Sequence, residues 1–194
     1  DTHAIDGRTP RQQLNAIREQ VLKLEDRQQR SLLALRDLLA ETGILIADTD
    51  QLDEEQAKWA EEYFTTDILP LITPQAIDPS HPFPFVQTMG LGLIFRLKRG
   101  KRKADLMEMV LIPSGAPRFV RVPGDKAVYI AIEKLVTRFA TLLFPGFKIL
   151  GDGVFRVLRD SDIEVEEEAE DLVRYFRTAI QRRRRGRAVL LELD

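Results

Sequence analysis

A proline-rich segment at residues 73–85 divides this chain into two parts of different periodicity. It reads TPQAIDPSHPFPF and holds four prolines and two phenylalanines. Each proline fixes its own φ angle and pushes the residue before it toward extended backbone, so the segment cannot form a helix. Its apolar side chains are costly to leave in water. We therefore expect a stiff connector whose Phe83 and Phe85 are buried between the helices before it and the sheet after it.

The residues before this connector have helical periodicity. Thr9 and Gln12 form a predicted capping box around a proline at the first helical position. Apolar residues at spacings of three and four follow as far as Gly43, a suitable left-handed stop. Asp53 begins a second helix, which we expect Pro70 to end. The pattern predicts an antiparallel helix pair.

After the connector the apolar period becomes two. From Met89 to Leu97 every odd position is apolar, which is typical of a half-buried strand. The Gly151-Asp152-Gly153 run is interpreted as a turn that leads into a strand. The fold class expected is α+β, with a mixed or antiparallel sheet and two or more packed helices. The remaining expected strands are residues 44–46, 106–112, 119–122, 154–159 and 188–193, and the remaining helices are 132–143 and 169–180.

Composition excludes several classes of site. The chain of 194 residues has no cysteine, so disulfides, thiol catalysis and cysteine-bound metals are ruled out. The net charge is −2, so binding of an anion or a nucleic acid would need a local basic patch. No apolar run approaches the length of about 20 residues that a membrane-spanning helix needs.

Two basic clusters are candidates for such a patch. The first, Arg182 to Arg185 with Arg187, ends a helix whose first turns are acidic, so it complements the helix dipole. We favour that interpretation, and contact of these guanidinium groups with phosphate stays open beside it. The second cluster lies in a predicted hairpin turn, where ordinary solvation is favoured; it consists of Lys98, Arg99, Lys101, Arg102 and Lys103.

Catalytic chemistry has few candidates in this chain. The two histidines, His3 and His81, lack a partner at a useful spacing, and no Walker-type glycine loop is present. We expect His81 to have a structural role in the connector, together with Phe83 and Phe85. The residues alone therefore predict neither a catalytic, a cofactor-binding nor a metal site.

Four segments resemble bacterial polyphosphate kinases, in the same order along the chain. They are DGRTPRQQLNAI at residues 6–17, LITPQAIDPSHPFPF at 71–85, PRFVRVPG at 117–124 and FPGFKILGDGVFRVLRDSDIEVEEEAEDL at 144–172. In that family the connector joins the N-terminal helical domain to the middle, or head, domain. The resemblance implies that residues 1–79 belong to the helical domain and 80–194 to an α+β head domain that is incomplete at its C-terminal end.

The resemblance also implies a function for the parent enzyme. Polyphosphate kinases reversibly transfer the terminal phosphate of ATP to polyphosphate, with magnesium and a phosphohistidine intermediate. No catalytic residue of the family can be carried onto a position of this chain, because the nucleotide-contacting motif is expected upstream and the catalytic half downstream. The chain is therefore expected to be an inactive scaffold and dimerisation portion, with ATP and Mg²⁺ implied only for the parent.

The expected partners follow from the same resemblance. They are the catalytic domains of the same chain, a second or further copy in a homodimer or higher homo-oligomer, and polyphosphate with ATP or ADP for the parent. The expected location is the cytoplasm, with peripheral association with a membrane left open, and no nucleic acid is expected. The alternative is a non-catalytic module that binds an anionic polymer, polyphosphate or nucleic acid, through Arg182 to Arg187. A pure dimerisation module is a third interpretation.

Overall fold

A computed structural model describes residues 5–80, 82–100, 105–160 and 186–194 of the chain. It divides into two units: residues 1–46 with 123–129, and residues 47–122 with 130–194. This division follows spatial packing, and the domain boundary expected after residue 79 stays a prediction. None of the helices in the described ranges combines the length and apolarity needed to cross a membrane.

The first unit is built on one long helix. Helix α1 (Pro10–Glu41) begins at the predicted capping box, in which the Thr9 amide donates to Gln12 Oε1 at 2.8 Å and the Gln12 amide to Thr9 Oγ1 at 3.3 Å. Gly43, at φ +85°, ends it as expected, since only glycine adopts this conformation freely. Strand β1 (Ile44–Ile46) then pairs in parallel with β6 (Ala127–Ala131), a strand that the sequence analysis missed.

Helix α1 has no buried residue along its whole described length. Its apolar stripe stays open, with Leu14 at 66% and Leu38 at 58% exposure. The expected partner helix, α2 (Glu54–Tyr63), belongs to the second unit, so the antiparallel pairing of the two stays a prediction.

Helix α2 begins at the predicted cap, where the Gln56 amide donates to Asp53 Oδ1 at 2.8 Å. It continues as a π-helical turn, η1 (Phe64–Ile68), and a 3₁₀ turn, η2 (Leu69–Leu71). Pro70 lies inside η2, one residue before its end. Because proline has no N–H to donate, it is tolerated in the first turn of such an element, and the helical path ends directly after it.

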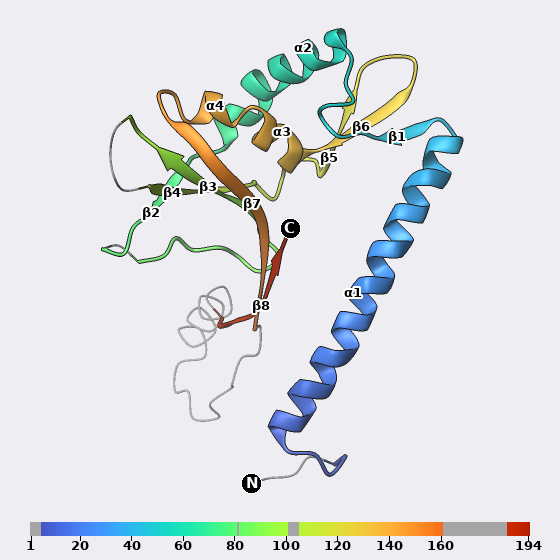
Figure 1. The fold of residues 1–194 in the computed structure, drawn as a ribbon, viewed down its shortest axis with the longest axis vertical. Helices are drawn as coiled ribbons and strands as arrows, with labels where there is room; N and C mark the ends of the chain where they lie inside the picture. The colour runs from blue at the N-terminus through green and yellow to red at the C-terminus, as the bar shows by residue number, and fades with distance from the viewer. Residues whose placement is uncertain (1–4, 81, 101–104, 161–185) are drawn as a thin grey trace, which may run out of the picture. The chain divides into compact units, whose positions relative to one another are not determined.

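The second unit contains a five-stranded antiparallel sheet, which confirms the α+β class (Figure 1). Its strand order is β2-β4-β3-β7-β8. A second sheet has the order β1-β6-β5, with β5 at Phe119–Val122. The strands of the larger sheet are β2 (Gln75–Ile77), β3 (Leu91–Lys98), β4 (Leu106–Leu111), β7 (Lys148–Arg159) and β8 (Ala188–Leu193).

Strand β7 is twice as long as expected. The Gly151-Asp152-Gly153 run lies inside it, so the predicted turn is wrong. The pairs Arg96↔Gly151 and Leu97↔Ile149 leave Leu150 as an extra residue, which marks a bulge. Glycines in a strand often accompany such a bulge, and here pairing with β3 holds them in extended backbone.

Both faces of the larger sheet are packed. On one face Phe95 lies 5.1 Å from Phe144 between ring centroids, and Phe64 lies 5.4 Å from Phe139, in a core shared with α3 (Ile132–Arg138) and α4 (Ala140–Leu143). The opposite face carries a smaller cluster of Val86, Met109, Phe155 and Val157.

The described part of the connector contains strand β2 and no helix, as expected, but its phenylalanines are not buried. Phe83 is 59% and Phe85 47% exposed, so that prediction is wrong, while Val86 is fully buried. Successive side chains of extended backbone point to opposite sides, and the inward position falls on Val86. The expected site residue His81 lies outside the described residues.

Candidate functional site

The arginine cluster for which contact with an anion was left open lies mostly beyond the described ranges. Arg182, Arg183, Arg184 and Arg185 lie outside them, and nothing tests their role. Arg187 is described and exposed, and its carbonyl oxygen accepts a hydrogen bond from the Asp160 amide at 2.8 Å. The favoured interpretation, that the cluster complements the helix dipole, therefore stays a prediction, and contact with an anion stays open beside it.

Arg159, at the end of β7, holds the end of the connector, a role that the sequence pattern predicts for burial of Phe83 and Phe85. Its Nε donates to the Val86 carbonyl at 2.6 Å, and its Nη1 to the Gly186 carbonyl at 2.9 Å. Its guanidinium carbon lies 5.1 Å from the centroid of the Phe85 ring, within the range of a cation–π contact. No local sequence pattern predicts this role, because the partners of Arg159 are 73 and 27 positions away.

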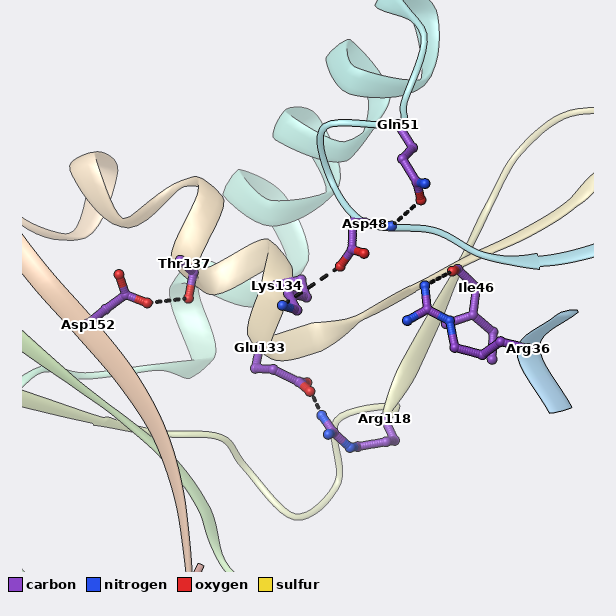
Figure 2. Close-up of polar contacts among 9 residues, drawn as sticks. All are labelled: Arg36, Ile46, Asp48, Gln51, Arg118, Glu133, Lys134, Thr137 and Asp152. Atoms are coloured by element: carbon purple, nitrogen blue, oxygen red, sulfur yellow. Dashed lines mark hydrogen bonds and ion pairs between the residues drawn. The ribbon is translucent and has the colours of Figure 1, made fainter. Parts of the chain in front are cut away.

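Two arginines of the second unit form ion pairs with carboxylates of neighbouring elements. Arg118 pairs with Glu133 of α3 (Figure 2), and Arg156 of β7 pairs with Glu192 of β8. Burial lowers the pKa of Arg118, and the nearby Arg156 lowers it further. The hydrogen bond between Arg156 and Glu192 raises the pKa of the arginine and lowers that of the carboxyl. Each guanidinium is thus matched by its own carboxylate, which leaves little attraction for another anion.

Helix α3 uses its polar side chains for further structural contacts (Figure 2). Lys134 Nζ lies 3.7 Å from Asp48 Oδ1, and the Thr137 hydroxyl lies 3.4 Å from Asp152 Oδ2 on β7. In the first unit, Arg36 Nη2 donates to the Ile46 carbonyl at 2.9 Å and ties α1 to β1. These contacts orient secondary-structure elements and activate no nucleophile.

The described residues do not supply the histidine and the metal-binding side chains that phosphoryl transfer would need. Both histidines, His3 and His81, lie outside the described ranges. In the part of the chain that the structure describes, no three His, Cys, Asp or Glu side chains come together to hold a metal ion. We therefore derive no catalytic step for these residues.

A groove lies between the end of the connector and the end of β4. Val86, Gly90, Leu111 and Pro113 contribute to its lining, which includes no charged side chain. A phosphate-bearing ligand would find no cation there, so the groove does not fit a nucleotide or polyphosphate.

Comparison with known proteins finds relatives of the chain in one enzyme family. The family model of the polyphosphate kinase middle domain matches residues 55–194. A polyphosphate kinase of Erythrobacter litoralis is 58% identical over the whole chain, and one of Mycolicibacterium gilvum is 36% identical over 98% of it. The chain spans 27% of each of these two relatives.

A solved structure supports the fold as well. The crystal structure of polyphosphate kinase from Porphyromonas gingivalis matches 88% of this chain, and 29% of its own, with a TM-score of 0.72 at 22% identity. At that identity the match concerns the fold alone. The family model covers well over half of the chain, including its complete larger sheet, so the chain belongs to the polyphosphate kinase family.

Proposed function

We propose that this chain is the scaffold and dimerisation portion of an enzyme that reversibly transfers the terminal phosphate of ATP to polyphosphate. The observation that carries the proposal is the 58% identity, over all 194 residues, to a protein named polyphosphate kinase. The catalytic residues belong to other parts of that enzyme, and ATP and Mg²⁺ act there.

The contacts of the described residues support a scaffold role. Arg118 and Arg156 are neutralised by carboxylates, and α3 is tied to its surroundings by Glu133, Lys134 and Thr137. A rigid framework of this kind can hold catalytic domains in register, because productive geometry tolerates little displacement of the reacting groups.

A chimeric enzyme tests the proposal. The matching 27% of the Erythrobacter litoralis protein is replaced by this chain, and synthesis of polyphosphate from ATP and Mg²⁺ is measured. We expect activity close to that of the parent. The corresponding segment of the Mycolicibacterium gilvum protein, which is 36% identical to this chain, is inserted in the same way for comparison, and we expect it to support less activity. A chimera that folds but makes no polyphosphate would contradict the proposal.

The chain alone should not transfer phosphate. After incubation with γ-labelled ATP and magnesium we expect no acid-labile phosphate on the protein and no polyphosphate product. A phosphohistidine mechanism needs a positioned imidazole and cations around the transferred group, and the sequence has only His3 and His81. Stoichiometric labelling that disappears in His81→Ala would contradict the scaffold role.

Self-association is the second half of the proposal. The exposed apolar stripe of α1 supports it, since open apolar surface of this extent favours association. Sedimentation velocity over a range of concentrations should show a dimer or larger species. A strict monomer at high micromolar concentration would exclude dimerisation through this chain.

A further inference from the structure

One end of the larger sheet carries three cations on a single face. Lys98, the last residue of β3, pairs directly with Lys148, the first residue of β7. Residues that pair directly across antiparallel strands project their side chains to the same face. Arg96 lies two residues before Lys98 on β3 and therefore projects to that face too. We call Arg96, Lys98 and Lys148 the strand-end basic patch.

The patch faces away from the main core. The neighbouring pair Leu97↔Ile149 belongs to the core that α3 and α4 share, and alternation places the flanking lysines on the other side. Lys148 is exposed and Lys98 is partly exposed. The side chain of Arg96 is 56% exposed, with Asp105 Oδ2 at 3.9 Å from its Nε.

The charges of the patch are not balanced by the described residues. Asp105 offsets part of the charge of Arg96, while neither lysine has an ion pair within the described ranges. Two ammonium groups directly opposite each other on antiparallel strands are destabilising. An anion that bridges them would remove this repulsion. The sequence indicates only a solvated turn at Lys98, because its neighbour Lys148 lies 50 positions away along the chain.

We propose that the strand-end basic patch binds the polyphosphate chain. This inference rests on the proposed function, which supplies polyphosphate as the polymer. Successive same-face positions on a strand lie about 7 Å apart, and paired strands about 5 Å apart. A flexible polymer with a charge on each phosphate can therefore contact all three cations at once. Lysine binds phosphate as a point charge, and arginine adds a planar pair of donors.

Polyphosphate fits this patch better than nucleic acid does. Sites for single-stranded nucleic acid combine cations with open aromatic faces on which bases stack. The ring next to the patch in sequence, Phe147, is covered by Arg99, whose guanidinium carbon lies 5.4 Å from its centroid. A chain of phosphates needs no stacking surface.

The test measures binding of fluorescently labelled polyphosphate of defined length to the chain over a series of salt concentrations. We expect Lys98→Ala/Lys148→Ala to weaken binding by at least about tenfold, because two contacts to phosphate are lost. The slope of log affinity against log salt should fall by about 1.4, since each contact to a single-stranded polyanion contributes about 0.7. Thermal stability should not fall, because the substitution removes a repulsive pair.

Matched variants distinguish binding by the strand-end basic patch from a general effect of the net charge. Lys58→Ala/Lys126→Ala removes two exposed lysines elsewhere and should change affinity less than about twofold. Lys98→Arg/Lys148→Arg keeps the charges and should retain binding. The site is wrong if the patch variant binds like the Lys58/Lys126 control, if the unaltered chain does not bind polyphosphate at low salt, or if single-stranded DNA competes equally. In each of these cases an active chimera would leave the proposed function standing, whereas an inactive chimera would refute that function independently.

Discussion

The guanidinium of Arg118 pairs with the carboxylate of Glu133, whose side chain is only 9% exposed (Figure 2). Within the described ranges Glu133 is the one charged residue that is buried. The backbone reinforces the same connection, because the Ile132 amide donates to the Arg118 carbonyl at 3.1 Å. The segment before β5 is thus held to the first turn of α3 by a main-chain bond and an ion pair.

Removal of Arg118 should be costly for this reason. Arg118→Met keeps much of the aliphatic stem but leaves the Glu133 carboxylate buried without its partner. We expect the free energy of unfolding to fall by about 1–3 kcal/mol, the usual penalty for an unsatisfied buried group. Urea denaturation of both proteins measures this difference.

The double variant Arg118→Met/Glu133→Gln is the control. It removes the stranded charge, so it should be more stable than Arg118→Met alone. If the double variant loses as much as the sum of the two single variants, the two side chains do not interact and the ion pair has no energetic role.

The two phenylalanines of the connector should respond differently to truncation. Phe83 is 59% exposed, so Phe83→Ala should change the free energy of unfolding by less than about 0.5 kcal/mol. Phe85 contacts the guanidinium of Arg159, so Phe85→Ala should lower the free energy of unfolding by about 0.5–1 kcal/mol more than Phe83→Ala does. Chemical denaturation under the same conditions compares them. A loss of several kcal/mol in Phe83→Ala would mean that this ring is buried after all.

The sequence predicted those helices and strands whose caps or apolar alternation lie within a few residues of one another. The capping residues Thr9 and Asp53 each start a helix where expected, because a cap satisfies amides within its own turn. Strands β5 and β8 have the predicted bounds, and β4 ends one residue early. Alternation identified β3 because one of its faces lies on the core, although the strand begins at Leu91 rather than Met89, which has a φ of +60°.

The elements that were missed depend on partners distant in sequence. Strand β2 pairs with β4 and strand β6 pairs with β1, and in both cases the partner lies far away in the sequence. The glycines of β7 were assigned to a turn because no local feature indicates pairing with β3. The contacts of Arg159 and the opposition of Lys98 and Lys148 arise in the same way, since only the fold brings these residues together.

Glu108 should make the protein less stable as pH rises. Burial on β4 raises the pKa of its carboxyl above the usual 4.5, so the folded state holds this proton to higher pH than the unfolded state does. The free energy of unfolding therefore falls as pH rises between the unfolded-state pKa and the higher folded-state pKa of Glu108, and it stays lower above that range. Glu108→Gln cannot ionise, so we expect it to be more stable than the unaltered chain at pH 7. The gain should shrink as pH falls through the raised pKa of the folded state and be lost below about 4.5.

Glu192 provides the opposite case in the same protein. Its hydrogen bond from Arg156 lowers its pKa, so it stabilises the fold above the usual 4.5 and this contribution is lost as pH falls through the folded value. Glu192→Gln should therefore be less stable than the unaltered chain at pH 7, with a deficit that shrinks in acid. Urea denaturation at several pH values compares the two variants. Equal pH profiles for both would contradict the assigned environments.

Strands β3 and β7 approach each other closely at Gly92. Gly92 pairs directly with Phe155, and a Cβ atom at Gly92 would lie 2.5 Å from Phe155 Cζ and 3.1 Å from Leu111 Cδ2. The ring has little room to move, because Phe155 is only 4% exposed and packs with Val86 and Met109. Gly92→Ala should therefore lower the free energy of unfolding by about 1–3 kcal/mol, as overpacking of a core does.

A compensating substitution shows whether the ring is the cause. Phe155→Leu alone should be destabilising, because it leaves space in the smaller core. In Gly92→Ala/Phe155→Leu the added methyl group occupies part of that space, so the loss should be smaller than the sum of the two single losses. Gly115→Ala is the matched control, since a Cβ there meets nothing within 4 Å. Additive losses in the double variant would show that Gly92 is required for a reason other than the ring of Phe155.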